Sequence, residues 1–157
     1  MNNDLSKALN FLQNGNLDEA KNLIKEVLKN EKNNSQALNL YAFVLYYQNN
    51  FNAALEQWQK AIKINPNYIE AYNGCGNAYK NLKKFEEAVQ SFKKAIQIEP
   101  RYFEAQINLG SVLIKLERFG VTKTVFSVRN VLTQNPLGVI ELSIMVEDFS
   151  KKHYKLI

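Results

Sequence analysis

The stretch from Ile69 to Pro100, IEAYNGCGNAYKNLKKFEEAVQSFKKAIQIEP, is the clearest copy of a pattern that repeats along this chain. It contains two segments with apolar residues at helical spacing, joined by the short polar turn NLKKF. A second copy, SQALNLYAFVLYYQNNFNAALEQWQKAIKINP, begins 34 residues earlier at Ser35, and a fainter copy begins at Met1. Self-similarity at a fixed period of this length predicts an all-α protein of stacked helical hairpins.

Small and bulky residues recur at fixed places within the period. A small side chain lets the two helices of a hairpin approach to about 8–10 Å, while bulky side chains one turn away fill the remaining space. The small columns are Ala20, Ala54, Ala88 and Ala8, Ala42, Gly76, Gly110; the bulky columns are Leu17, Phe51, Phe85, Phe119 and Phe11, Leu45, Tyr79, Leu113. The alternation therefore predicts closely packed helix pairs.

These columns resemble the tetratricopeptide repeat. The family pattern is matched by Tyr72, Cys75, Gly76, Tyr79, Ala88, Phe92, Ala95 and Pro100, and one period earlier by Leu38, Tyr41, Ala42, Leu45, Ala54, Trp58, Ala61 and Pro66. The resemblance implies a right-handed α-solenoid of helix-turn-helix hairpins that forms a single domain over residues 1–157. It places repeats at about 1–34, 35–68, 69–102 and 103–136, the last divergent, and a terminal capping helix at 137–157.

Helical periodicity predicts individual helices over residues 3–13, 17–30, 35–48, 52–64, 69–81, 86–97 and 103–116. After Phe119 the register shifts by two residues, yet a further helix is expected from the shared face of Val121, Val125, Val128 and Leu132. The last helix is expected to cover the open end of the stack with Leu142, Met145, Val146 and Phe149. Its remaining apolar residues, Val139, Ile140 and Ile144, favour self-association through this C-terminal helix.

Composition narrows the class of function. The formal charge of +5 comes from lysines scattered over all repeats, which is typical of solvated faces and makes nucleic acid an unlikely partner. No run approaches the roughly 18 apolar residues that cross a bilayer, so no membrane association is expected. Cys75 is the only cysteine and His153 the only histidine, which favours a reducing, cytoplasmic location without disulfides or a metal site.

The residues that could carry chemistry have simpler structural roles. Cys75 occupies a core column, and no histidine lies in any repeat to activate it as a nucleophile. Gly74 and Gly76 form GCG inside a helix, where close helix packing explains them better than a phosphate loop. We therefore expect no catalytic residues, no cofactor and no small-molecule substrate.

The resemblance implies that the first helix of each repeat lines a concave groove. Asparagine both donates and accepts hydrogen bonds, so a row of asparagines can hold the backbone of an extended peptide. The predicted peptide-binding residues, all expected to be exposed, are Asn39, Phe43, Tyr46, Asn73, Asn77, Lys80, Asn108, Ser111 and Lys115. The predicted function is that of a protein–protein interaction scaffold, with a protein or peptide as the partner.

Three other functions were weighed against this one. A clamp for the C-terminal carboxylate of chaperones needs cations, but the corresponding places hold Asn39, Phe43, Gly74, Glu104 and Asn108. The string AYNGCGNAYKNLKKFEEA is most similar to the repeats of O-linked N-acetylglucosamine transferase-like proteins. The chain is accordingly also interpretable as the substrate-targeting portion of a larger enzyme such as a glycosyltransferase, and salt-dependent RNA binding is a third possibility.

Overall fold

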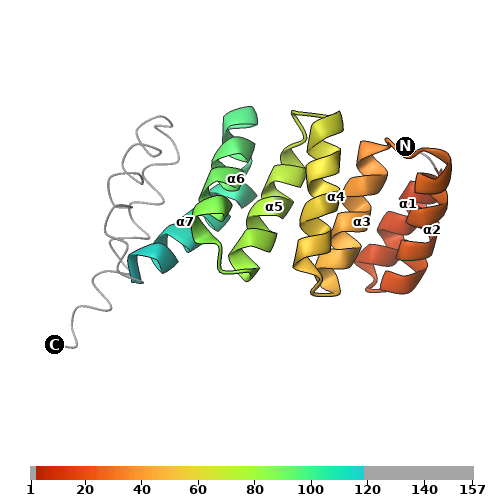
Figure 1. Ribbon diagram of the computed structural model, residues 1–157, viewed down its shortest axis with the longest axis horizontal. Coiled ribbons are helices and arrows are strands. Elements are labelled where there is room, and N and C mark those ends of the chain that lie inside the picture. The colour runs from red at the N-terminus through yellow and green to blue at the C-terminus, as the bar shows by residue number, and fades with distance from the viewer. Residues whose placement is uncertain (1–2, 119–157) are drawn as a thin grey trace. The chain divides into compact units, whose positions relative to one another are not determined.

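The computed structural model describes residues 3–118 of the chain (Figure 1). In this part every regular element is an α-helix, and the helices alternate with short turns. They are α1 (Asn3–Gln13), α2 (Leu17–Asn30), α3 (Ser35–Tyr47), α4 (Phe51–Ile64), α5 (Ile69–Asn81), α6 (Phe85–Ile98) and α7 (Phe103–Arg118). The predicted all-α class is confirmed, and the predicted helix ends differ from the observed ones by at most two residues.

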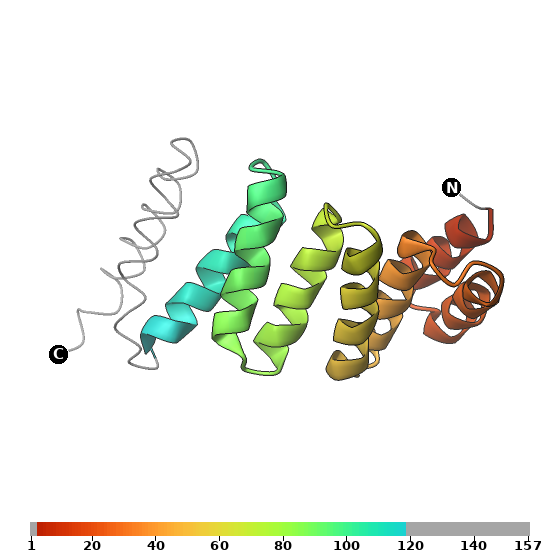
Figure 2. The same ribbon diagram turned by 45° about the horizontal axis from the view of Figure 1, so that its top comes forward.

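The chain divides into two compact units, residues 1–109 and 110–157. In the first unit, consecutive helices pair as the hairpins α1/α2, α3/α4 and α5/α6, and α2 contacts α3 as α4 contacts α5. Figures 1 and 2 both show these hairpins side by side in chain order. The described part of the second unit is the end of α7, where Val112, Leu113 and Leu116 are buried. The helices predicted after Phe119, including the capping helix, lie outside the described residues.

The turn inside each hairpin repeats one backbone conformation. Gly15, Asn49 and Lys83 all have positive φ, at 79°, 60° and 59°, and follow one another at intervals of 34 residues. Each follows the end of the first helix of its hairpin, and the two amides after the helix reach back to its last turn. For example, Lys83 N donates to Lys80 O at 3.2 Å and Lys84 N donates to Tyr79 O at 2.9 Å. This left-handed helix end reverses the chain within a few residues.

The core is built where the small and bulky columns meet. Ala54, Ala88, Trp58 and Phe92 are all fully buried. A Cβ atom on Gly76 would lie 2.6 Å from Phe92 Cδ1 within the same hairpin, so the buried Phe92 ring would have to shift to admit any side chain. The prediction that this glycine serves close helix packing is confirmed.

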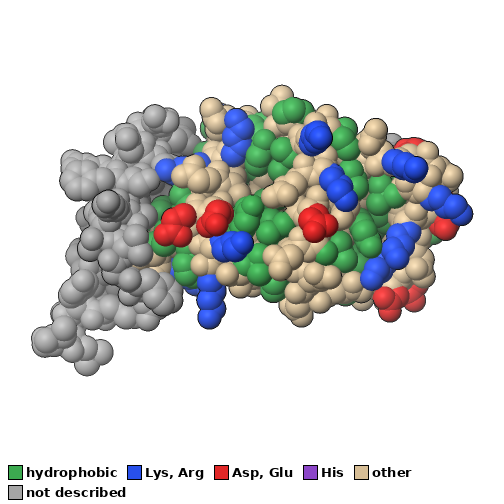
Figure 3. Space-filling model, viewed as in Figure 1, with side chains coloured by type: hydrophobic (Ala, Val, Ile, Leu, Met, Phe, Trp, Pro, Cys, Tyr) green, Lys and Arg blue, Asp and Glu red, His purple; other side chains and the backbone are tan. Residues whose placement is uncertain are grey.

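The surface carries no single block of positive charge on the face that Figure 3 shows, where lysine and arginine side chains stand at separate places among apolar and polar ones. Within residues 3–118, no helix combines the length and hydropathy that a bilayer-spanning segment needs.

Candidate functional site

The predicted groove residues occupy alternate helices, the first helix of each hairpin. Asn39, Phe43 and Tyr46 lie on α3, Asn73, Asn77 and Lys80 on α5, and Asn108, Ser111 and Lys115 on α7. Ser111 and Lys115 belong to the unit of residues 110–157, whereas the other seven belong to the unit of residues 1–109.

Two of the predicted groove residues are buried rather than exposed. Asn39 retains 7% and Asn73 only 3% of its accessible surface, so the expectation that both face solvent is wrong. Asn39 is hydrogen-bonded to Trp58 within its own hairpin, whereas Asn73 is hydrogen-bonded to Glu104 on the first helix of the next repeat. A buried amide without a partner would be costly, so Asn39 joins the two helices of one hairpin and Asn73 joins one repeat to the next.

An aromatic cluster surrounds Asn39. Trp58 on α4 is fully buried, and its Nε1 donates a hydrogen bond of 2.9 Å to Asn39 Oδ1. The ring of Phe43 meets the Trp58 ring edge-on, with centroids 5.3 Å apart, and the Tyr46 ring lies 5.9 Å from it. Phe43 and Tyr46 are thus half-buried, with one side of each ring against Trp58.

A hydrogen-bond network joins α5 to the beginning of α7. Asn73 Nδ2 donates to Glu104 Oε1 at 2.8 Å, and Asn73 Oδ1 accepts from Asn108 Nδ2 at 3.2 Å. The Tyr102 hydroxyl donates to Glu104 Oε2 at 3.2 Å. Lys80 Nζ lies 3.5 Å from Asn108 Oδ1, at the outer limit of a hydrogen bond. The asparagine row predicted to bind a peptide is therefore largely occupied with its own neighbours.

The side chain of Asn77, one of the predicted groove residues, keeps its hydrogen-bond donor and acceptor available. Asn77 is half-buried on α5, at the place that Phe43 takes on α3 one repeat earlier. Its backbone oxygen accepts from Asn81 Nδ2 at 2.9 Å, and the same Asn81 nitrogen donates to the Tyr46 hydroxyl at 2.8 Å. Within residues 3–118 no hydrogen bond engages the Asn77 side chain amide.

Sequence reasoning gave no place in the site to four residues beside the groove, although it weighed Glu104 against a carboxylate clamp. Tyr68 and Glu70 recur one period later as Tyr102 and Glu104, and this recurrence at 34 residues is the signal that could have revealed them. Burial raises the pKa of Tyr102 most, and the carboxylates of Glu104 and Glu70 raise it further. Burial and then Glu70 also raise the pKa of Tyr68, whereas the Asn39 side chain lowers it. Each tyrosine therefore stays protonated beside an acidic side chain.

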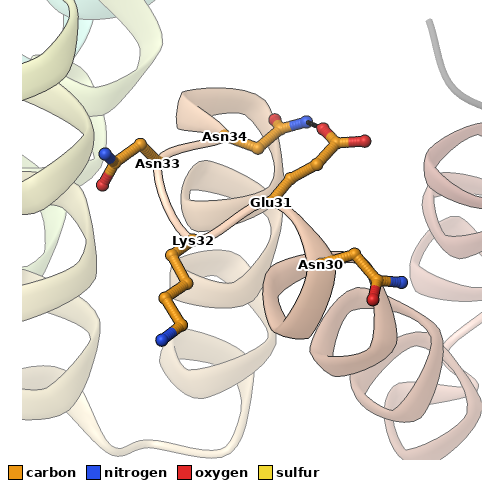
Figure 4. Close-up of a pocket in the computed structure, with 5 residues that line it drawn as sticks. All are labelled: Asn30, Glu31, Lys32, Asn33 and Asn34. Atoms are coloured by element: carbon orange, nitrogen blue, oxygen red, sulfur yellow. Dashed lines mark hydrogen bonds between the residues drawn. The ribbon is translucent and has the colours of Figure 1, made fainter.

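Two polar hollows lie at the turns that connect one hairpin to the next. The hollow at the α2–α3 turn has a volume of about 490 Å³ (Figure 4), and there Asn34 Nδ2 donates to Glu31 Oε2 at 2.6 Å. Figure 4 shows the Asn33 side chain pointing away from this pair. The adjoining hollow, of about 550 Å³, also reaches the α4–α5 turn and is lined by Asn33, Asn34, Ser35, Gln36, Asn65, Asn67, Tyr68 and Glu70.

The single cysteine is part of the core, as its column predicted. Cys75 is 3% exposed, and burial raises the pKa of its thiol from 9.0 to about 12. The thiol is therefore protonated at neutral pH and is a poor nucleophile. Among the described residues, no three side chains of histidine, cysteine, aspartate or glutamate gather in a group that could hold a metal ion.

Paired helices, a left-handed turn at a 34-residue interval and small residues at each crossing define a helical-repeat protein. Part of the chain matches a known family: a "TPR repeat" model matches residues 42–83, and a "Tetratricopeptide repeat" model matches residues 69–102. No curated protein matches the chain by sequence.

Solved structures share this fold at low sequence identity. The first TPR of Spaghetti (RPAP3), bound to the HSP90 peptide SRMEEVD, is 24% identical with a TM-score of 0.69, over 73% of this chain and 90% of that chain. Thermobaculum terrenum O-GlcNAc transferase is 23% identical with a TM-score of 0.68, over 70% of this chain but 21% of that chain. MamA is 19% identical with a TM-score of 0.70, over 92% of this chain and 79% of that chain.

Proposed function

We propose that this chain is a non-enzymatic scaffold that binds an extended segment of a partner protein along α3, α5 and the first turns of α7. The observation that carries the proposal is a set of hydrogen bonds between alternate helices. Asn81 on α5 bonds to Tyr46 on α3, and Asn73 on α5 bonds to Glu104 on α7. Because these bonds already hold the side chains in place, binding a partner would cost little further side-chain conformational entropy.

The predicted groove residues divide into two roles under this proposal. Asn39 and Asn73 have structural roles, because both are buried and hydrogen-bonded: Asn39 to the second helix of its own hairpin, and Asn73 to the next repeat. Phe43 and Tyr46 offer the outer sides of their rings for apolar contact, and the Asn77 amide offers a donor and an acceptor to a peptide backbone. Contacts from Lys80, Asn108, Ser111 and Lys115 to the partner remain predictions.

The same surface is poorly suited to a chaperone C-terminus. The structurally similar TPR of Spaghetti binds an HSP90 peptide. In this chain Glu104 stands where the clamp pattern would require a cation, and its carboxylate is fixed by Asn73 and Tyr102. A terminal carboxylate placed beside it would be repelled, so we propose a segment bound by its backbone and apolar side chains.

A phage-displayed library of random 12-residue peptides, selected on the immobilised full chain, tests the proposal. We expect enriched peptides whose affinity, measured by fluorescence anisotropy, falls about tenfold for Asn77→Arg, because the longer side chain fills the groove. The matched control is Asn52→Arg, at an exposed position on α4, which should leave the affinity unchanged. Peptides that bind Asn77→Arg and the wild type equally well would place binding elsewhere and contradict the groove.

A further inference from the structure

The polar hollow between the α2–α3 and α4–α5 turns lies next to the proposed groove. Its lining includes Gln36 and Glu70, the second residues of α3 and α5, which are two of the helices that form that groove. We propose that this hollow is a subsite for a basic side chain, an arginine above all, of the bound partner segment. The inference rests on the proposed function and adds the chemistry of the segment that the groove selects.

The lining of the hollow favours a cation. Seven of its eight residues are uncharged amides or hydroxyls, and the remaining one is Glu70, so its formal charge is negative. A guanidinium group carries five N–H donors in a fixed plane and no acceptor, which suits a wall that offers a carboxylate and several amide oxygens. An acidic side chain would meet the Glu70 carboxylate without any cation in the lining to offset it.

Some of the lining amides already form hydrogen bonds within the turns, so only the other lining amides can bind a partner side chain. Asn34 Oδ1 accepts from Ala37 N at 3.0 Å at the start of α3, and Asn65 Oδ1 accepts from Asn67 N at 3.1 Å. Within residues 3–118 no hydrogen bond engages the side chains of Asn33, Gln36 or Asn67. Their three carbonyl oxygens can therefore accept from a guanidinium group that is paired with Glu70.

Glu70 differs in its contacts from Glu104, its equivalent one repeat later. Both oxygens of Glu104 accept hydrogen bonds, from Asn73 and Tyr102. In the earlier repeat Asn39 Oδ1 accepts from Trp58 and the Asn39 side chain also interacts with Tyr68, and among the described residues Glu70 has neither a hydrogen bond nor an ion pair. The two equivalent carboxylates therefore differ in their partners: Glu104 is satisfied, and Glu70 is available.

The charge of Glu70 already acts on its surroundings. After burial it is the main cause that raises the pKa of Tyr68, and it adds, less than burial and Glu104 do, to the raised pKa of Tyr102. A cation bound at Glu70 would oppose this effect. Because Glu70 is exposed, water screens the pair, so its contribution to affinity is modest and its main effect is on which side chain the hollow selects.

Peptides selected by phage display on the full chain provide the probe. We expect an arginine, or less often a lysine, at a constant position in the enriched peptides. The affinity of a synthetic peptide of this kind should fall about two- to fivefold for Glu70→Gln, because Glu70 is exposed. Replacing the peptide arginine by alanine should give the same loss with the wild type and no further loss with Glu70→Gln.

The matched control is Glu86→Gln, since Glu86 is the second residue of α6 as Glu70 is the second residue of α5, and it does not line the hollow. It should leave the affinity unchanged. Glu70→Lys should prefer the peptide in which glutamate replaces the arginine, which keeps the test independent of any loss of affinity through altered folding.

Enriched peptides without a basic residue, or equal binding by Glu70→Gln and the wild type, would overturn the subsite but leave the groove in place. A library that yields no binding peptide would overturn the groove function and the subsite with it.

Discussion

Trp58 Nε1 donates a 2.9 Å hydrogen bond to Asn39 Oδ1, across 19 residues of sequence and between the two helices of one hairpin. Both side chains are buried, and Trp58 has no exposed surface at all. This pair explains why an asparagine in a first helix need not face a partner, because its amide is part of the packing between helices.

Asn39→Ala should lower the free energy of unfolding by about 1–3 kcal/mol, because it leaves the Trp58 N–H buried without an acceptor. Urea denaturation followed by circular dichroism measures this in every variant, including those that lack Trp58, the only tryptophan. The control is Trp58→Phe combined with Asn39→Leu, which removes both polar groups. The combined variant should lose less than the sum of the two single ones, and strict additivity would contradict the role given to the hydrogen bond.

Gly74→Ala should destabilise the fold, although alanine favours helices more than glycine does. A Cβ atom at Gly74 would lie 2.8 Å from Trp58 Cδ2, and overpacking of this kind costs about 1–3 kcal/mol. Thermal denaturation followed by circular dichroism measures the loss. In a Trp58→Leu background the same change should be neutral or stabilising, and an equal loss there would assign the cost to something other than this contact.

Asn73→Ala and Asn77→Ala should separate structure from binding on one helix. Asn73→Ala removes the hydrogen bonds to Glu104 and Asn108 and should cost about 1–2 kcal/mol of stability. Asn77→Ala should change stability by less than about 0.5 kcal/mol. Chemical denaturation of both variants measures the difference, and equal effects would show that the α5–α7 network does not carry the stability assigned to it.

Lys83→Gly should stabilise the protein by about 0.5–1 kcal/mol. Lys83 has φ of 59°, a left-handed conformation that is strained for a residue with a Cβ atom and free for glycine. Lys83→Ala is the matched control, because it removes the same charge but keeps a Cβ atom at the strained φ. Denaturation midpoints compare the two, and an equal gain from both variants would point to charge removal instead of backbone strain.

Stability should fall as pH rises from about 9 to about 12, in part because of Cys75. Burial raises the pKa of its thiol from 9.0 to about 12, so over this range the thiol ionises in the unfolded chain before it ionises in the folded one. The contribution is complete below pH 9 and is lost at up to about 1.4 kcal/mol per pH unit. Cys75→Ala should show a shallower decline in urea denaturation across this range, and parallel curves would contradict the assignment.

Much of the fold follows from local pattern. The 34-residue period, the small columns and the helical spacing predict the hairpins, and the helix ends agree with the structure to within two residues. These features are set by interactions within one repeat or between adjacent repeats, which recur at every period. The burial of residues such as Ala54 and Trp58 can therefore be predicted from the sequence.

The candidate site was less predictable, because polar residues face in directions that only packing decides. Helical spacing placed Asn39, Asn73 and Asn77 on the same kind of face, yet two are buried and one keeps its amide available. The difference comes from which side chain arrives from the neighbouring helix, such as the Trp58 N–H at Asn39. The sequence by itself determined the repeat and its core. The tertiary structure decided which polar groups form hydrogen bonds inside that core, because such bonds between helices depend on three-dimensional proximity and not on spacing along the chain.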